Sequence, residues 1–270
     1  GNLSVTAAAT GADATGDATV SVTTGSITVA GNATVTGGAV AGQVATLTVT
    51  GAGAAGQGVN IGGTLNIVST IAGTATVSTT NATSRITVAG AGGINNGDTL
   101  SVGVGLVSVT NAAATLTTTN TSGIAATTSV TTGTLAIAGN AVVDSGTNGL
   151  KRITLTTGVI TVGGNLSVTA AAATADTGDA TVSITTGRIT VTGNTTVTGG
   201  TTANRDALLT VTGAGAVGQG VNIGGTLNIV APTVAGSATV STTNATSRIT
   251  VSGAGGINNG DTLSVGVGLV

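Results

Sequence analysis

Acidic side chains are the groups in this chain best suited to acid–base catalysis or metal binding. The 270 residues contain eight Asp, no Glu and six Lys plus Arg. The carboxylates are Asp13, Asp17, Asp98, Asp144, Asp176, Asp179, Asp206 and Asp261. Paired carboxylates can hydrolyse glycosides or bind Ca²⁺, but no D-x-D-x-D loop or G-G-x-G-x-D series is present. Because half of these residues directly precede a predicted strand, we interpret the carboxylates as turn residues.

The basic residues are few and scattered. Arg85 and Arg248 occupy equivalent places in two "ATSRITV" segments, and we interpret them as solvated residues at strand ends. Lys151 and Arg152 lie in the coil that directly precedes Asp179, so an ion pair between coils can form there. An exposed pair of this kind contributes about 0–1 kcal/mol. Neither group predicts a binding site.

Composition excludes most function classes. The chain has no His, Cys, Met, Phe, Trp or Tyr, so the usual zinc, haem, disulfide and Ser-His-Asp or Cys-His chemistry is absent. There are no aromatic rings on which bases or sugars could stack, and a net charge of −2 argues against nucleic-acid binding. No stretch of 18 apolar residues predicts a transmembrane helix. We therefore expect no catalytic, cofactor-binding or metal-binding residues, and we predict that the protein is not an enzyme.

A long internal repeat organises the chain. Residues 1–107 recur as 164–270, so that "GQGVNIGGTLNIV" and "GAGGINNGDTLSVGVGLV" each occur twice. The repeat unit is therefore about 163 residues, and the second copy is incomplete. We predict one continuous unit over 1–270. Both ends lie inside the repeating pattern, so we expect either a window of a longer chain or a subunit that stacks head to tail.

A shorter period lies within the long one. Segments rich in Val, Ile and Thr alternate with a period of two residues and are separated by Gly and Asn, which predicts short strands and turns. The strands fall into groups of three, spaced 25 to 29 residues apart. Each group of three strands is one coil of about 27 residues. Six coils make one long repeat unit, and about ten coils make the whole chain.

These patterns predict an all-β, parallel β-solenoid with three short strands per coil. A single coil cannot bury its apolar face, but stacked coils can, and each strand then pairs with its equivalent about 4.8 Å away. The alternative is an antiparallel sandwich of immunoglobulin-like modules, which usually carry a core Trp or Tyr. Because such rings are absent, the solenoid is favoured.

The solenoid prediction has two specific consequences. Residues about 27 positions apart are expected to stack inside one sheet, namely Val22, Val49, Val77, Val102, Val130 and Leu155. The turns "AGN", "GGN" and "TGN" place Asn140, Asn165 and Asn194 at the same point of three consecutive coils. Asn tolerates turn conformations and its amide can bond to the next amide above. We therefore predict a structural asparagine ladder at these three residues.

Several segments resemble repeats of a known protein family. They are "GSITVAGNATVTGG" (25–38), "GTLAIAGNAVV" (133–143) and "GVITVGGNLSVTA" (158–170). These segments are similar to repeats of bacterial adhesins of the filamentous-haemagglutinin and autotransporter type. The resemblance extends over essentially the whole chain. It implies a secreted protein built as a long right-handed β-helix at the cell surface.

The sequence thus favours a structural role. We expect an extracellular filament or surface fibre, such as a cell-surface rod, a matrix or an adhesin stalk, that self-associates or continues in a longer chain. One alternative is an adhesin module that contacts a glycan or another cell through its loops. An enzyme of the β-helix lyase type would need Asp, Lys and Arg grouped on one face. An ice-binding solenoid would need one regular Thr face, whereas Thr is spread over the whole chain.

Overall fold

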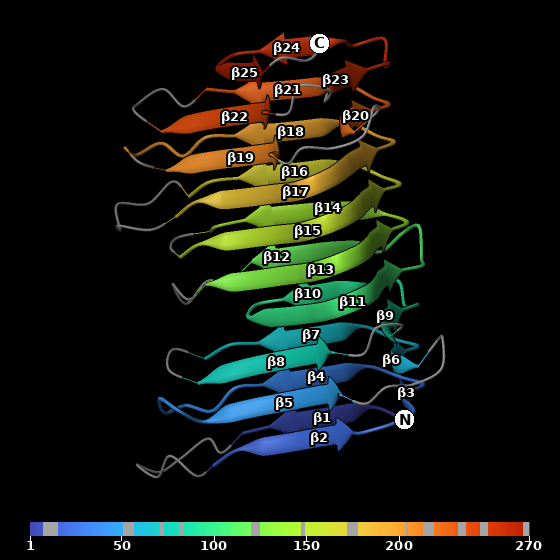
Figure 1. The fold of residues 1–270 in the computed structure, drawn as a ribbon. Coiled ribbons are helices and arrows are strands. Elements are labelled where there is room, and N and C mark those ends of the chain that lie inside the picture. The colour runs from blue at the N-terminus through green and yellow to red at the C-terminus, as the bar shows by residue number, and fades with distance from the viewer. Residues whose placement is uncertain are drawn as a thin grey trace.

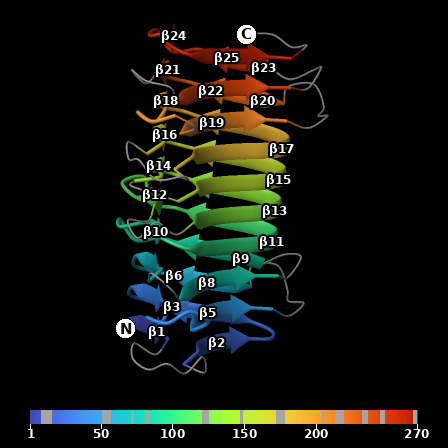
Figure 2. The same cartoon turned by 90° about the vertical axis from the view of Figure 1, so that its left-hand side faces the viewer.

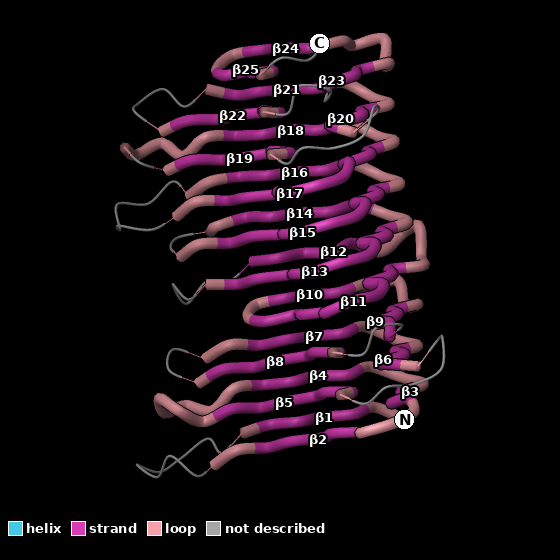
Figure 3. The backbone as a smooth tube through the Cα atoms, in the orientation of Figure 1, coloured by secondary structure: helices cyan, strands magenta, loops and turns pink. Residues whose placement is uncertain are grey.

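The chain forms a stack of β-strands in the computed structural model, which is all β with no helix among the described residues (Figures 1 and 3). The described residues are 1–7, 16–50, 57–70, 73–80, 84–119, 125–146, 149–171, 178–203, 205–212, 219–231, 236–243, 248–266 and 270. Every strand pairing among them is parallel. The predicted parallel β-solenoid is confirmed.

The first face of the solenoid is a ten-stranded sheet. Its strands, in spatial order, are β1 (Leu3–Thr6), β4 (Ala33–Thr36), β7 (Leu65–Val68), β10 (Ile94–Asn96), β12 (Thr115–Thr119), β14 (Asn140–Asp144), β16 (Leu166–Thr169), β18 (Thr195–Thr198), β21 (Leu227–Val230) and β24 (Ile257–Asn259). From Leu3 to Ile257 the register advances in nine steps, so one coil averages about 28 residues. The predicted spacing was about 27.

The second and third faces belong to one fifteen-stranded sheet. The second face contains β2 (Ala18–Val22), β5 (Val44–Val49), β8 (Thr74–Thr79), β11 (Thr99–Val109), β13 (Ala126–Ile137), β15 (Lys151–Val162), β17 (Ala180–Val191), β19 (Asp206–Val211), β22 (Ser237–Thr242) and β25 (Thr262–Val265). The third face contains β3 (Ser26–Val29), β6 (Gly58–Ile61), β9 (Ser84–Val88), β20 (Gly220–Ile223) and β23 (Arg248–Val251). In the four middle coils, one long strand forms both faces (Figure 2).

A stack of glycines turns the long strands from the second face to the third. Gly133, Gly158 and Gly187 lie directly above one another, and their φ angles of 141°, 141° and 147° fall where side chains are strained. A Cβ atom on Gly158 would also overlap the carbonyl oxygen of Gly133, and one on Gly187 that of Gly158. The recurring "TTG" therefore marks the corner at which only glycine fits.

The core consists of apolar rows that run along the stack. Alternation along each strand turns Val, Ile, Leu and Ala inward and mostly Thr, Ser and Asn outward. The first-face row contains Val5, Val35, Ile67, Asn96, Thr118, Val143, Val168, Val197, Ile229 and Asn259. The second-face row contains Val20, Leu47, Val77, Leu100, Thr128, Ile153, Val182, Leu209, Val240 and Leu263.

The predicted register is correct except at Val77. Val22 pairs with Val49, and Val102, Val130 and Leu155 follow one another in the same row as predicted. The residue between Val49 and Val102 is Thr79, however, because β8 pairs two residues out of the predicted register. Both Val77 and Thr79 point inward, and a shift of two residues leaves every side chain on its face. The apolar pattern alone therefore does not distinguish the predicted register from the observed one.

Candidate functional site: polar ladders and a buried polar cluster

The three predicted asparagines lie at one turn of consecutive coils and are joined by hydrogen bonds. The Oδ1 atom of Asn140 accepts a hydrogen bond from the backbone N–H of Asn165 at 2.8 Å. Asn165 accepts one from the N–H of Asn194 at 2.8 Å, and Asn194 from that of Thr226 at 2.8 Å. The acceptor is thus a side-chain oxygen and the donor is a backbone amide. Each asparagine connects its own coil to the next one.

The glycine before each asparagine makes room for this contact. A Cβ atom on Gly164 would overlap Oδ1 of Asn140, and one on Gly193 would overlap Oδ1 of Asn165. The side chain from the coil below therefore passes across the glycine to reach the next N–H. We call this repeated arrangement the Gly-Asn ladder, and its two residue types act as one unit.

The Gly-Asn ladder also occurs at the N-terminal end of the stack. Oδ1 of Asn2 accepts from the N–H of Asn32, and Oδ1 of Asn32 from that of Thr64, both at 2.9 Å. Gly31 and Gly63 again lie where a Cβ would overlap the asparagine oxygen below. The prediction was of bonds between side-chain amides, and at three residues only, whereas the observed donor is a backbone N–H and the same "GN" signal is present here as well.

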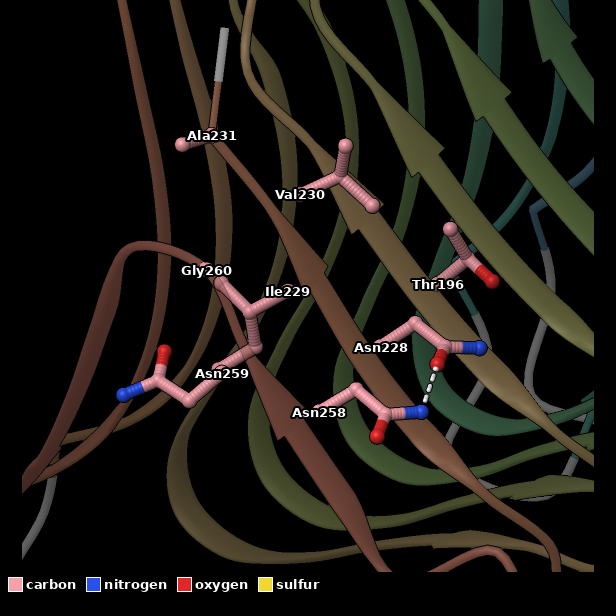
Figure 4. A pocket seen from close by; sticks show the side chains of 8 residues that line it. All are labelled: Thr196, Asn228, Ile229, Val230, Ala231, Asn258, Asn259 and Gly260. Atoms are coloured by element: carbon pink, nitrogen blue, oxygen red, sulfur yellow. Dashed lines mark hydrogen bonds between the residues drawn. The ribbon is translucent and has the colours of Figure 1, made fainter.

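A second type of asparagine ladder lies on the outer surface of the first face, and sequence reasoning missed it. Nδ2 of Asn95 donates to Oδ1 of Asn66 at 2.9 Å, and Nδ2 of Asn258 donates to Oδ1 of Asn228 at 2.7 Å. Figure 4 shows the second pair beside a shallow, open surface hollow of about 600 Å³. The available signal was the "LNI" and "INN" strands, whose outward residues are asparagines in both copies.

Aspartate side chains join neighbouring coils in a similar way. Oδ1 of Asp17 accepts from the N–H of Val44 at 2.8 Å, and Oδ1 of Asp179 from that of Asp206 at 3.0 Å. Asp98 instead reaches the coil below, where its Oδ2 accepts from Ala75 at 2.6 Å. These three residues immediately precede strands, as the turn interpretation requires, whereas Asp144 and Asp206 lie within β14 and β19. Asp13 and Asp176 lie outside the described residues.

A polar cluster lies inside the core of one coil pair. Nδ2 of Asn96 donates to Oγ1 of Thr128 and to the carbonyl oxygen of Thr127, both at 2.9 Å. Oγ1 of Thr118 is 3.0 Å from Oγ1 of Thr128. The side-chain Oδ1 of Asn96 accepts from the N–H of Asp98 at 3.1 Å. Asn96, Thr118 and Thr128 are fully buried, so these hydrogen bonds replace contacts with water.

Three charged side chains are buried among the described residues, namely Asp98, Lys151 and Arg205, and the first two have shifted pKa values. Burial raises the pKa of Asp98, although hydrogen bonds from Ala75 and Thr99 act in the opposite direction. Lys151 has no exposed surface, and burial lowers its pKa to about 8, partly offset by the negative charge of Asp144. The backbone N–H of Lys151 bonds to the carbonyl oxygen of Asp179 at 3.0 Å. Lys151 is thus part of the core rather than of a binding surface.

The remaining candidates are the two arginines at equivalent places in the repeat and the acidic side chains. Arg85 and Arg248 are exposed on the third face, in β9 and β23, and β11, β13, β15, β17 and β20 lie between them. No three acidic side chains within the described part of the chain are placed to hold a metal ion. No helix that could cross a membrane is found in the same residues. The polar groups that the fold does bring together connect coil to coil.

Comparison of the chain with protein-family models, curated proteins and solved structures yields no match. The functional argument therefore depends on the chain's own residues.

Proposed function

We propose that this protein is a structural component of an extracellular filament or surface fibre. The observation that carries the proposal is the unbroken axial stack. Ten strands on the first face and ten on the second are paired in parallel from β1 to β24 and from β2 to β25. At about 4.8 Å per strand, each coil lengthens the rod without changing its cross-section. Such a fold transmits tension through backbone hydrogen bonds along its axis.

The side chains support the same role. The interior is filled by Val, Ile, Leu and Ala, and coils are connected by asparagine and aspartate at their turns. The charged fraction is 5% and the chain lacks His and Cys, so its surface is dominated by unreactive hydroxyl and amide groups. A surface of this kind suits a passive rod that repeats many times.

The geometry favours this role over the two binding alternatives. A glycan site would be expected to offer aromatic rings, which the whole chain lacks. An ice-binding face would need Thr in every coil, but the outward row on the first face mixes Thr34, Asn66, Thr117, Val142 and Ser167 in the coils that the structure describes. The second face carries a more regular row of threonines, but Arg152 and Leu208 interrupt it.

Electron microscopy of material from the native source tests the proposal. We expect uniform fibres one coil wide, with a meridional reflection near 4.8 Å in fibre diffraction because the strands lie across the axis. Protease treatment of intact cells is expected to remove exposed loops of the protein. A monodisperse globular particle confined to the cell interior would contradict the proposal.

A further inference from the structure

The third face carries two exposed arginines in one row, two coils apart. Arg188 of β17 aligns with Gly220 of β20, which in turn aligns with Arg248 of β23 (Figure 1). Two coil steps place the Cα atoms of the two arginines roughly 10 Å apart along the axis. A Cβ atom on Gly220 would overlap the carbonyl oxygen of Arg248, so no side chain can fill the space between the arginines. We call Arg188, Gly220 and Arg248 the arginine row.

A surface hollow of about 270 Å³ lies beside the arginine row on the same three strands. Gly224 lines it, and a Cβ atom there would overlap the carbonyl oxygen of Thr192, so backbone packing keeps the hollow open. The polar side chains of the lining are Thr190, Thr192, Asn222, Thr250 and Ser252. Three of them follow the arginine row by two residues along each strand, a distance of roughly 7 Å.

The two copies of the long repeat differ at this place in a consistent direction. Residues 26–30, 58–62 and 85–89 of the first copy correspond to 188–192, 220–224 and 248–252 of the second. The two sets differ at three positions, where Arg188, Thr192 and Ser252 replace Ser26, Ala30 and Ala89. Each difference adds a charged or hydrogen-bonding group to the arginine row or to the hollow. The first copy therefore has one arginine and a less polar surface at the equivalent place.

No acidic side chain among the described residues lies on the third face. The described carboxylates belong to the end of the first face or the start of the second, at Asp17, Asp98, Asp144, Asp179, Asp206 and Asp261. The arginine row begins at the other end of the second face, beyond the glycine corner. Its positive charge is thus available to a ligand.

We infer that the arginine row and the adjacent hollow form a binding site for an acidic polysaccharide whose sugars carry carboxylates. A guanidinium group pairs with a carboxylate through two parallel N–H···O bonds, and the hydroxyl and amide groups of the hollow can exchange hydrogen bonds with sugar hydroxyls. Aromatic rings hold neutral sugars by stacking, whereas charge supplies the attraction here. The inference goes beyond the structural role, because it gives the side of the rod a ligand.

The spacing of the arginines matches a polysaccharide that lies along the axis of the rod. In an extended 1,4-linked uronate chain, every second sugar presents its carboxylate on the same side, and that repeat is close to two coil steps. Such a chain would bring one carboxylate to Arg188 and the next equivalent one to Arg248. An acidic peptide would match the arginines but would make little use of the hydroxyl-lined hollow.

Binding of short oligomers of 1,4-linked mannuronate to the chain, measured by titration calorimetry, tests the inference. We expect Arg188→Ser to weaken binding about tenfold, because a charged hydrogen-bonding partner is lost. Arg85→Ser is the matched control, since it removes the same charge from the equivalent of Arg248 in the first copy, and it is expected to leave binding unchanged. The double variant Thr192→Ala, Ser252→Ala is expected to weaken binding about threefold. Except in the Arg85→Ser control, the substitutions restore residues that the first copy carries in the same fold, which protects the variants against misfolding.

The reciprocal variant Ser26→Arg, Ala30→Thr, Ala89→Ser transfers the site to the first copy, where Arg85 already occupies the place of Arg248. We expect the stoichiometry to rise from one binding site to two. An unchanged stoichiometry would overturn the inference, and so would equal weakening by Arg85→Ser and Arg188→Ser. Equal affinity for polyglutamate would overturn the assignment to a polysaccharide, and tighter binding of heparin would assign the arginines to sulfate instead of carboxylate. No binding even at low salt, where exposed charges are least screened, would exclude the site.

Discussion

The Gly-Asn ladder and the buried cluster are both polar contacts between coils, yet they have opposite consequences. The ladder lies at an exposed turn and recurs at five coil-to-coil steps among the described residues. The cluster lies in the core and occurs in full at one step. A contact that recurs holds several coils to their neighbours but cannot distinguish one neighbour from another. A contact that occurs only once can distinguish the correct neighbouring coil from the others.

The difference matters because the apolar rows alone do not determine which coil lies next to which. Val, Leu and Ile alternate along them with similar volumes, and a parallel stack of near-identical strands tolerates slippage by a whole coil. A slip of that kind would keep most Gly-Asn contacts. It would place the amide of Asn96 against an aliphatic side chain instead of Thr128. Buried polar groups of this sort are the best-attested devices for setting register.

The largest effect is expected at a recurring feature, the glycine corner. Gly158→Ala would combine a strained φ with a Cβ that overlaps the Gly133 carbonyl, and we expect a loss of about 3–5 kcal/mol in urea denaturation. Gly25→Ala is the matched control, because its φ is 119° but its nearest Cβ neighbour is 3.8 Å away. It is expected to lose about 1–2 kcal/mol. Equal losses would show that the stacked carbonyl is unimportant.

The next effect distinguishes the cluster from the ladder. Thr128→Val preserves shape but leaves Oγ1 of Thr118 without its partner and removes one acceptor of Asn96, so we expect a loss of about 1–3 kcal/mol. The triple variant Asn96→Leu, Thr118→Val, Thr128→Val removes the polar groups together. Its loss is expected to be smaller than the sum of the three single losses. Full additivity in the denaturation data would mean that the three residues do not act as a unit.

The coil architecture could be predicted from sequence because it depends on short-range patterns. Period-two alternation of Val and Thr defines each strand, and Gly-Asn defines the turn before the first face. In the coil formed by β13 and β14, for example, inward and outward residues alternate as a period of two requires. Such signals repeat in every coil, so an ambiguous segment is resolved by its neighbours.

The buried cluster could not be predicted in the same way. Asn96, Thr118 and Thr128 belong to three different strands, and nothing about their spacing shows that they meet across the core. Inward Thr also occurs elsewhere without a partner, as at Thr79 and Thr242, whose buried hydroxyls make no hydrogen bond. Which inward polar residues meet depends on how each strand is aligned with the strand in the next coil. The error at Val77 shows that the apolar pattern does not determine this alignment.

The pH dependence of stability offers a third test of the cluster, through Asp98. Because burial raises its pKa, the folded protein binds this proton more tightly than the unfolded chain, in which Asp has a pKa near 3.9. The stability contributed by neutral Asp98 is therefore complete below about pH 3.9 and is lost as the pH rises through the folded value. Relative to Asp98→Asn, the wild type is expected to lose stability as the pH rises above about 3.9. Parallel pH profiles for the two proteins would contradict this.

The smallest effect is expected at the Gly-Asn ladder. Asn140→Ala removes one hydrogen bond to the N–H of Asn165, and because the turn is exposed, water can replace it. We expect a loss of about 0.5–1 kcal/mol, and similar losses for Asn165→Ala and Asn194→Ala. Since each side chain serves a different coil step, the triple variant is expected to lose approximately the sum of the three. This near-additivity is the opposite of the behaviour expected for the cluster. Denaturation of the four ladder variants alongside the four cluster variants measures the contrast directly, and strong coupling within the ladder would remove the distinction between recurring and unique contacts.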